Sequence, residues 1–228
     1  FKRVNTVKIL FMVFHFPPIS GGGVVVIVEL ANKFAELGHD ITILTPDLEW
    51  KGEKYEPLLN EKISIEKVST PSKSNLKIAA RRCHDNMKKK GIELGKHNNY
   101  DFILSIFHPF HLVPKAAVAC GKELQKPVLI KVDDAIYEKA KGIKKIQRRI
   151  EKMYNSKTLQ NADKVLVMND FTKKIVNEYY SVADNRISIV TNGTDLEKFY
   201  NSRENNKRVI FSGAMYHHRG IDVLLNCV

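Results

Sequence analysis

The stretch that decides the fold is residues 7–45, VKILFMVFHFPPISGGGVVVIVELANKFAELGHDITILT. It begins with a largely apolar run, Val7–Phe14, in which Lys8 is the one charged residue. It continues through a segment rich in proline and glycine, and ends in a second short apolar run, Ile41–Leu44. We interpret this order as strand, glycine-rich turn, helix and strand. It predicts the first βαβ unit of a doubly wound, mostly parallel α/β sheet of the Rossmann type.

The middle of this stretch carries two conflicting signals. The run Val24–Val28 is β-branched throughout, and propensity alone would favour a strand there. We favour a helix, because apolar residues from Val28 to Leu37 repeat at spacings of three and four. Gly38 then stands where a left-handed helix C-cap belongs, and the next apolar run starts soon after it.

Three consecutive glycines, Gly21, Gly22 and Gly23, come directly before this helix. A helix N-terminus leaves backbone N–H groups unpaired and favours an anion, and glycine allows a ligand to approach the backbone closely. We therefore predict that the glycines bind phosphate or sugar hydroxyls; the alternative is that they only make a tight turn. The spacing is not GxGxxG, and no Lys-Ser/Thr pair follows, so two common phosphate-binding motifs are absent.

Composition limits the possible classes of protein. The chain has 228 residues, 43% of them apolar, and a net charge of +12, which indicates an acidic partner. It contains neither an apolar run long enough to span a membrane nor a secretory signal. Its three cysteines, Cys83, Cys120 and Cys227, are far apart, which is typical of reduced thiols in the cytosol. We therefore expect a cytoplasmic location.

Polar side chains follow the predicted strands at the points where they end. Residues 101–107 and 127–132 read as buried parallel strands, and ligands bind beyond the carboxyl ends of such strands. The residues just past strand ends are His15, His108, His111, Asp133 and Asp134. We predict that these residues bind substrate. The two aspartates have two interpretations, as an acceptor ligand or general base, and as a helix cap.

The remaining pattern continues the alternation of strands and helices. Further strands are predicted at residues 63–68, 162–168 and 187–190, and further helices at residues 75–90, 112–124, 136–160 and 171–180. We expect one Rossmann-like domain over residues 1–200. Residues 201–228 supply a linker, one strand and the start of a helix, which cannot bury a core. We therefore expect these residues to be the first piece of an incomplete second domain.

The predicted helix over residues 136–160 is strongly basic, as is the end of the helix near residue 90. One interpretation is a solvated charged surface; the other is a patch that docks on anionic lipid at the inner face of a membrane. Lysine and arginine do not alternate with aromatic residues as nucleic-acid stacking platforms require, so no nucleic-acid partner is expected. The adjacent pair His217–His218 cannot close a metal site by itself, and we expect no metal.

Three segments, in the same order and spacing, resemble the retaining family 4 glycosyltransferases of the GT-B fold. KILFMVFHFPPISGGG with ELANKFAELGHDITILTPD resembles the opening of that family, TNGTDLEKFY its NGVD-x-x-x-F segment, and VIFSGAMYHHRGIDVLL the start of its second domain. The resemblance implies two Rossmann-like domains that face each other across a cleft. It implies transfer of a hexose from a nucleotide-sugar to a glycan, a lipid-linked molecule or another acceptor, without a metal cofactor.

The resemblance also assigns roles to particular residues. Gly21–Gly23 match the family's glycine loop near the donor phosphates, and His108 matches a histidine that points at the donor sugar, which makes it the catalytic candidate. Asn192 and Gly193 match the segment before the linker. The Asp133–Asp134 pair departs from the family, where many relatives have a histidine. The family's diphosphate-binding groups would lie beyond the last residue, so we expect the chain to be inactive alone; the alternative is a non-catalytic nucleotide- or sugar-binding α/β module.

Overall fold

The computed structural model describes residues 5–70, 75, 82–109, 111–133, 143–194, 210–211 and 220–227. The chain divides into two compact units, Phe1–Asn192 and Gly193–Val228. In the second unit the described residues include one short helix, α7 (Ile221–Leu225). The predicted domain boundary at residue 200 and the pair His217–His218 lie outside the described residues.

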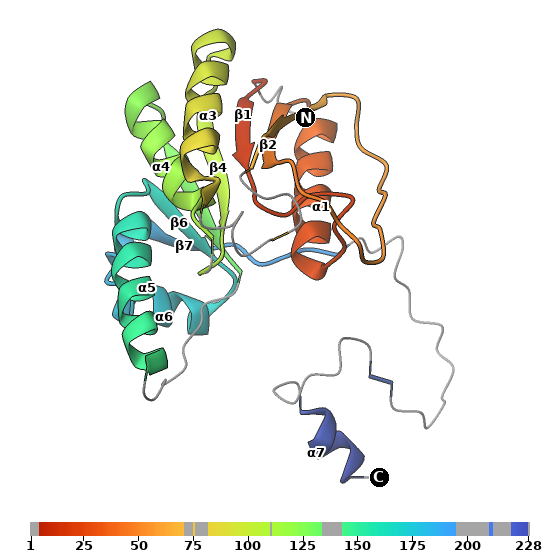
Figure 1. The fold of residues 1–228 in the computed structure, drawn as a ribbon, viewed down its shortest axis with the longest axis vertical. Helices are drawn as coiled ribbons and strands as arrows, with labels where there is room; N and C mark the ends of the chain where they lie inside the picture. The colour runs from red at the N-terminus through yellow and green to blue at the C-terminus, as the bar shows by residue number, and fades with distance from the viewer. Residues whose placement is uncertain are drawn as a thin grey trace. The chain divides into compact units, whose positions relative to one another are not determined.

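The first unit is built on a parallel sheet of seven strands in the order β3-β2-β1-β4-β5-β6-β7 (Figure 1). The strands are β1 (Lys8–Met12), β2 (Asp40–Pro46), β3 (Ile63–Val68), β4 (Phe102–Phe107), β5 (Val128–Val132), β6 (Lys164–Val167) and β7 (Ile187–Ile189). Every neighbouring pair in this sheet is parallel, from β3 with β2 to β6 with β7. The doubly wound α/β fold predicted from the sequence is confirmed.

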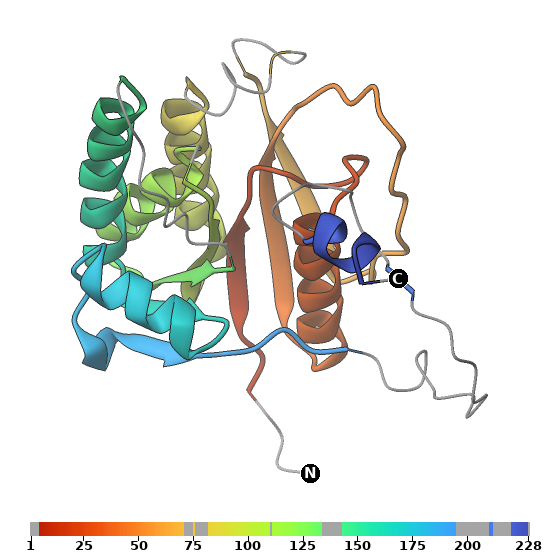
Figure 2. The ribbon, with the colours of Figure 1, turned by 90° about the horizontal axis from the view of Figure 1, so that it is seen from below.

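Helices cover both faces of the sheet (Figure 2). They are α1 (Gly22–Glu36), α3 (His84–Asn98), α4 (Val113–Leu124), α5 (Ile143–Gln160) and α6 (Asp170–Glu178). Side chains alternate along a strand, so β1 serves two cores. Leu10 and Met12 pack in the cluster that includes α3 and α4, whereas Ile9 and Phe11 pack in the cluster that includes α1. Burial on both faces explains why β1 is apolar from Ile9 to Met12.

The valine-rich segment after the glycines is a helix, as predicted, despite its β propensity. The buried positions of α1 are Val24, Ile27, Val28, Ala31 and Ala35, which recur at helical spacing. Packing against the sheet outweighs local propensity here, because a buried helical face contributes more than the modest difference in propensity. The chain then passes through Gly38, whose φ is +92°, and enters β2. The predicted left-handed turn is confirmed.

One predicted boundary is wrong. Helix α3 continues to Asn98 instead of ending near residue 90, and it ends where Asn99 adopts a left-handed conformation. Gly91 lies inside the helix, where a Cβ would be 3.0 Å from Sγ of Cys120. Strand β2 includes Pro46, although proline has no N–H to donate to a neighbouring strand. Since β1 ends opposite Leu44, no strand needs the N–H that Pro46 lacks on that side.

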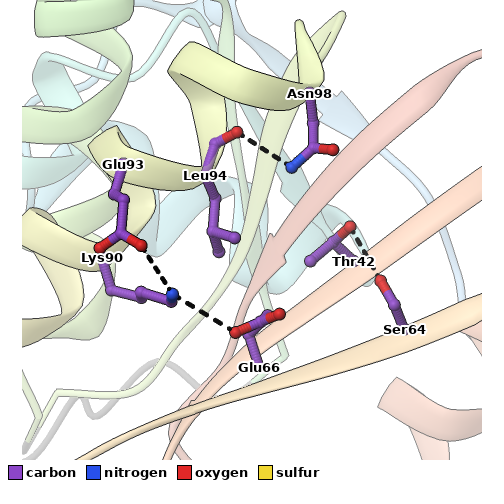
Figure 3. A network of polar contacts seen from close by, with 7 residues as sticks. All are labelled: Thr42, Ser64, Glu66, Lys90, Glu93, Leu94 and Asn98. Carbon is purple, nitrogen blue, oxygen red and sulfur yellow. Dashed lines mark hydrogen bonds and ion pairs between the residues drawn. The ribbon is translucent and has the colours of Figure 1, made fainter.

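Polar contacts fasten α3 to the sheet edge that β3 forms (Figure 3). The ammonium of Lys90 lies 2.9 Å from the carboxylate of Glu93 and 3.6 Å from that of Glu66 on β3. On the strands, the hydroxyl of Ser64 donates to that of Thr42 at 3.1 Å. These contacts are at least partly exposed to solvent, so they contribute little free energy compared with the apolar packing behind them. Among the described helices, none is both long and apolar enough to cross a membrane.

Candidate functional site

Two loops at the carboxyl edge of the sheet bring three histidines together. The β1–α1 loop supplies Phe14 and His15, and the β4–α4 loop supplies His108 and His111. The ring of His111 is stacked between two others: its centroid lies 4.9 Å from that of Phe14 and 5.1 Å from that of His108. The ring of His15 contacts Phe14 edge-on at 4.7 Å and lies 6.1 Å from His111. We call these four residues the histidine cluster.

Burial keeps two imidazoles of the histidine cluster neutral. His111 is only 7% exposed, and burial, with the neighbouring His108 and His15, places its pKa well below the usual value. Burial and the charge of His108 lower the pKa of His15 to about 4. His111 Nδ1 is buried and hydrogen bonds to no other residue in the described part of the chain. At neutral pH these rings act as hydrogen-bonding groups and not as cations.

The three glycines form an open helix N-terminus. Gly21 is the N-cap of α1 with φ +150°, and its carbonyl accepts from the N–H groups of Val24 and Val25 at 3.0 and 3.1 Å. The N–H groups of Gly22 and Gly23 take no part in the described backbone hydrogen bonds. All three glycines are exposed, and a Cβ on any of them would meet nothing within 4 Å. The backbone donors are therefore accessible to an anion or a hydroxyl.

The loop that carries these glycines is anchored on its outer side. Residues 47–62 run beside it, and the N–H of Tyr55 donates to the carbonyl of Pro18 at 3.0 Å. An isolated antiparallel bridge pairs Ile19 with Lys54. Ile19 itself is buried in the cluster that includes α1. These contacts fix the point at which the chain turns into α1 and so fix the direction of the free N–H groups.

Asp133, one of the residues predicted to bind substrate, forms a partly buried ion pair. Its carboxylate pairs with the ammonium of Lys131, a residue of β5 whose side chain is only 5% exposed. The same ammonium donates to Oδ1 of Asn192 at 2.7 Å and lies 3.6 Å from the sulfur of Met168. No hydrogen bond, ion pair or ring contact among the described residues joins Asp133 to the histidine cluster. Asp134 lies outside the described residues.

Sequence reasoning missed Lys131 and Asn155. Lys131 joins the ends of β5 and β6 to the last residue of the first unit, and the signal for it was a single lysine inside the apolar run PVLIKV. Asn155 is buried in α5 and donates to the carbonyl of Pro109 at 3.4 Å, directly beside His108. Its signal was a polar residue on the inward side of a helix. Lys131 lies inside a strand and Asn155 inside a helix, so neither stands just past a predicted strand end.

The described side chains do not form a metal site. In the part of the chain that the structure describes, no group of three histidine, cysteine, aspartate or glutamate side chains is arranged to hold a metal ion. The rings of His108 and His111 are stacked face to face, so their nitrogens do not point toward one another as two ligands of one metal ion would.

A doubly wound parallel sheet, with an open helix N-terminus and neutral histidines at its carboxyl edge, defines a Rossmann-like α/β domain, and domains of this class bind their ligands at that edge. The chain belongs to the family described as Glycosyltransferase Family 4, whose model matches residues 20–198. The family resemblance drawn from the sequence motifs is confirmed. A comparison with curated proteins gives no match.

Solved structures show the same fold. A glycosyltransferase from Rickettsia africae has a TM-score of 0.56 and 18% identity over 85% of this chain and 45% of its own. HepE from Anabaena, in complex with UDP and glucose, has a TM-score of 0.57 and 10% identity over 86% and 47%. Sucrose-phosphate synthase from Thermosynechococcus elongatus has a TM-score of 0.60 and 14% identity over 85% and 50%. This chain therefore spans about half the length of each.

Proposed function

We propose that this chain supplies one domain of a two-domain glycosyltransferase, which transfers a hexose from a nucleotide-sugar to a glycan or lipid-linked acceptor. The observation that carries the proposal is the histidine cluster, built from two loops at the carboxyl edge where α1 also begins. Membership of Glycosyltransferase Family 4 supports the class of reaction. One similar structure holds UDP and glucose, and another, starch synthase IV from Arabidopsis thaliana, holds ADP and acarbose.

The chemistry of glycosyl transfer explains what these residues supply. Negative charge develops on the leaving diphosphate as the bond to the sugar breaks, and dipoles already in place stabilise it best. The free N–H groups of Gly22 and Gly23 lie at the positive end of α1, where the helix dipole favours an anion. We expect no metal to be required, because the helix dipole and these N–H groups offset part of the diphosphate charge.

The histidine cluster is suited to bind hydroxyl groups of a sugar. A neutral imidazole has one donor nitrogen and one acceptor nitrogen, so it can hydrogen bond to a hydroxyl in either direction. His111 holds His108 by ring stacking, and Asn155 holds the backbone of the adjacent Pro109. We assign His108 to the reacting sugar because it is half-buried just past the end of β4, whereas His111, whose ring stacks on it, is buried. The remaining donor-binding groups would be supplied by the second domain.

Nucleotide release by the full-length protein tests this function. The protein is supplied with a panel of nucleotide-sugars, with and without sugar or lipid-linked acceptors, and the free nucleotide is measured by a coupled assay. We expect release with at least one donor that rises when the matching acceptor is present. Binding of a donor with no release under any combination would support a non-catalytic binding module instead. Turnover by the 228-residue chain alone would contradict the proposed division of the site between two domains.

A further inference from the structure

The outer face of α5 is apolar where a surface helix should be polar. Ile146, Ile150 and Met153 are spaced at four and three residues, so they form one stripe along the helix. Their exposed fractions are 63%, 49% and 51%. Helix α5 lies at the outer edge of the helical layer of the first unit (Figure 2). We call this stripe, with the cations beside it, the α5 outer face.

The inward side of α5 carries polar side chains, so the usual arrangement of an apolar inner face and a polar outer face is partly reversed. Buried positions on that side include Asn155 and Thr158 as well as Leu159. Asn155 is held by the carbonyl of Pro109, and the hydroxyl of Thr158 donates to the carbonyl of Tyr154 at 3.0 Å. The apolar stripe is therefore not an extension of the core: the helix directs a row of large apolar side chains toward solvent.

Cations border the stripe. Helix α5 contains six lysine or arginine residues and one glutamate, and the carboxylate of that Glu151 lies 3.4 Å from the guanidinium of Arg148. Among the side chains of α5 that the structure describes, the exposed cations are Lys145, Arg149 and Lys157. A shallow hollow in this surface is lined by Arg149, Ile150, Lys152, Met153 and Ser156. It combines an apolar floor with cationic and hydroxyl groups, which suits a lipid with an anionic headgroup.

We propose that the α5 outer face docks on a membrane surface rich in anionic lipid. A helix that lies in the membrane interface buries an apolar stripe among the acyl chains while lysine and arginine at its sides bind lipid phosphates. The 18 residues of α5 span roughly 27 Å, long enough for several headgroups along one side. The proposal goes beyond the proposed glycosyl transfer and does not depend on it.

Other occupants fit this surface less well. A second copy that paired through the same face would bring the cations of one α5 close to those of the other, and like charges oppose that contact. A nucleic acid would use the cations but would leave Ile146, Ile150 and Met153 without partners. An anionic membrane satisfies the apolar and the cationic groups at the same time.

Vesicle co-sedimentation with designed variants tests the proposal. The 228-residue chain is mixed with vesicles of phosphatidylcholine alone or with about 30% phosphatidylglycerol, in about 0.1 M salt. One variant removes the stripe (Ile146→Ser, Ile150→Ser, Met153→Ser), and another removes the cations (Lys145→Gln, Arg149→Gln, Lys157→Gln). Circular dichroism verifies that each variant is folded.

Two matched controls carry the same chemical change elsewhere. Leu37→Ser with Leu58→Ser removes apolar side chains that are 56% and 92% exposed, away from α5. A triple variant at exposed lysines removes the same net charge as the cation variant: Lys51→Gln, Lys62→Gln and Lys122→Gln. If binding only reflected total charge or total exposed apolar surface, these controls would lose as much binding as the α5 variants.

We expect the chain to bind anionic vesicles at least about tenfold more strongly than neutral ones. Each α5 variant should lose at least about tenfold in affinity, while the controls stay within about twofold. Equal binding to neutral and anionic vesicles, no binding to either, or equal losses in the controls would overturn the proposal. So would a dimer in light scattering that the α5 variants dissociate while vesicle binding is absent, because the occupant would then be a second copy.

Discussion

The buried ammonium of Lys131 makes the stability of the first unit sensitive to Asp133. Changing Asp133→Asn removes the carboxylate that neutralises an ammonium whose side chain is only 5% exposed. The ammonium keeps Oδ1 of Asn192 at 2.7 Å and the sulfur of Met168, but no anion among its described partners. Folding must then bury a charge without compensation, which is costly in a protein interior.

The two partners should respond differently. Removing one partner of a fully buried ion pair costs about 3–5 kcal/mol, and the 19% exposure of Asp133 with the remaining Asn192 contact reduces this to about 2–3 kcal/mol for Asp133→Asn. Lys131→Met places an apolar side chain in a buried position and leaves a carboxylate that water can reach. We expect it to cost less than about 1.5 kcal/mol, and the double variant to be no worse than Lys131→Met alone.

Urea and thermal unfolding at pH 7 measure these free energies. For a chain of this size the expected loss in Asp133→Asn lowers Tm by about 5–10 °C. Glu93→Gln is the control: it breaks an ion pair with Lys90 whose partners are 55% and 28% exposed, and should leave the free energy of unfolding nearly unchanged (Figure 3). A loss of stability in Asp133→Asn no larger than in this control, or a larger loss in Lys131→Met than in Asp133→Asn, would contradict this expectation.

Three further predictions follow from single features of the structure. Gly21→Ala should lower the free energy of unfolding by about 1 kcal/mol because Gly21 has φ +150°, whereas Gly23→Ala, with open space and no positive φ, should be neutral or stabilising in the same urea titration. Because the pKa of His15 is about 4 in the folded chain, the unfolded chain binds more protons than the folded chain does as the pH falls below 6.5. His15 alone should therefore lower the free energy of unfolding by about 2 kcal/mol between pH 7 and pH 5. His15→Gln should reduce this dependence of stability on pH. Iodoacetamide should modify only Cys227 in the native chain, since burial raises the pKa of the other two thiols to about 12, and mass spectrometry should find three modified thiols in urea.

Much of the fold could be predicted because the strongest local signals and the packing agree. The apolar run of β1 is buried on both sheet faces, and the helical repeat of α1 matches its buried stripe. The sequence pattern was misleading where glycine occurs inside a helix, because glycine is used both to end helices and to allow close packing. Gly91 resembles a helix stop, but it permits α3 to approach Cys120 closely. A glycine chosen for contact with a distant element cannot be distinguished locally from one chosen for a turn.

The candidate site could be predicted only in outline. The rule that ligands bind beyond the carboxyl ends of parallel strands located His15, His108 and His111, and the structure brings all three into one cluster. The same rule also selected Asp133, whose carboxylate pairs with a buried lysine. That pairing depends on the order of β5 and β6 and on the path of the chain after β7. Such long-range contacts leave no periodic signal in the sequence.

The nucleotide-release rate of His108→Gln in the full-length protein tests directly whether the histidine cluster binds the reacting sugar. His97→Gln is the matched control, because His97 is an exposed residue of α3 outside the cluster. We predict that His108→Gln lowers kcat/KM by about 100-fold or more, while His97→Gln stays within about twofold. An unchanged rate for His108→Gln would contradict the assignment of this edge of the sheet as the site of sugar transfer.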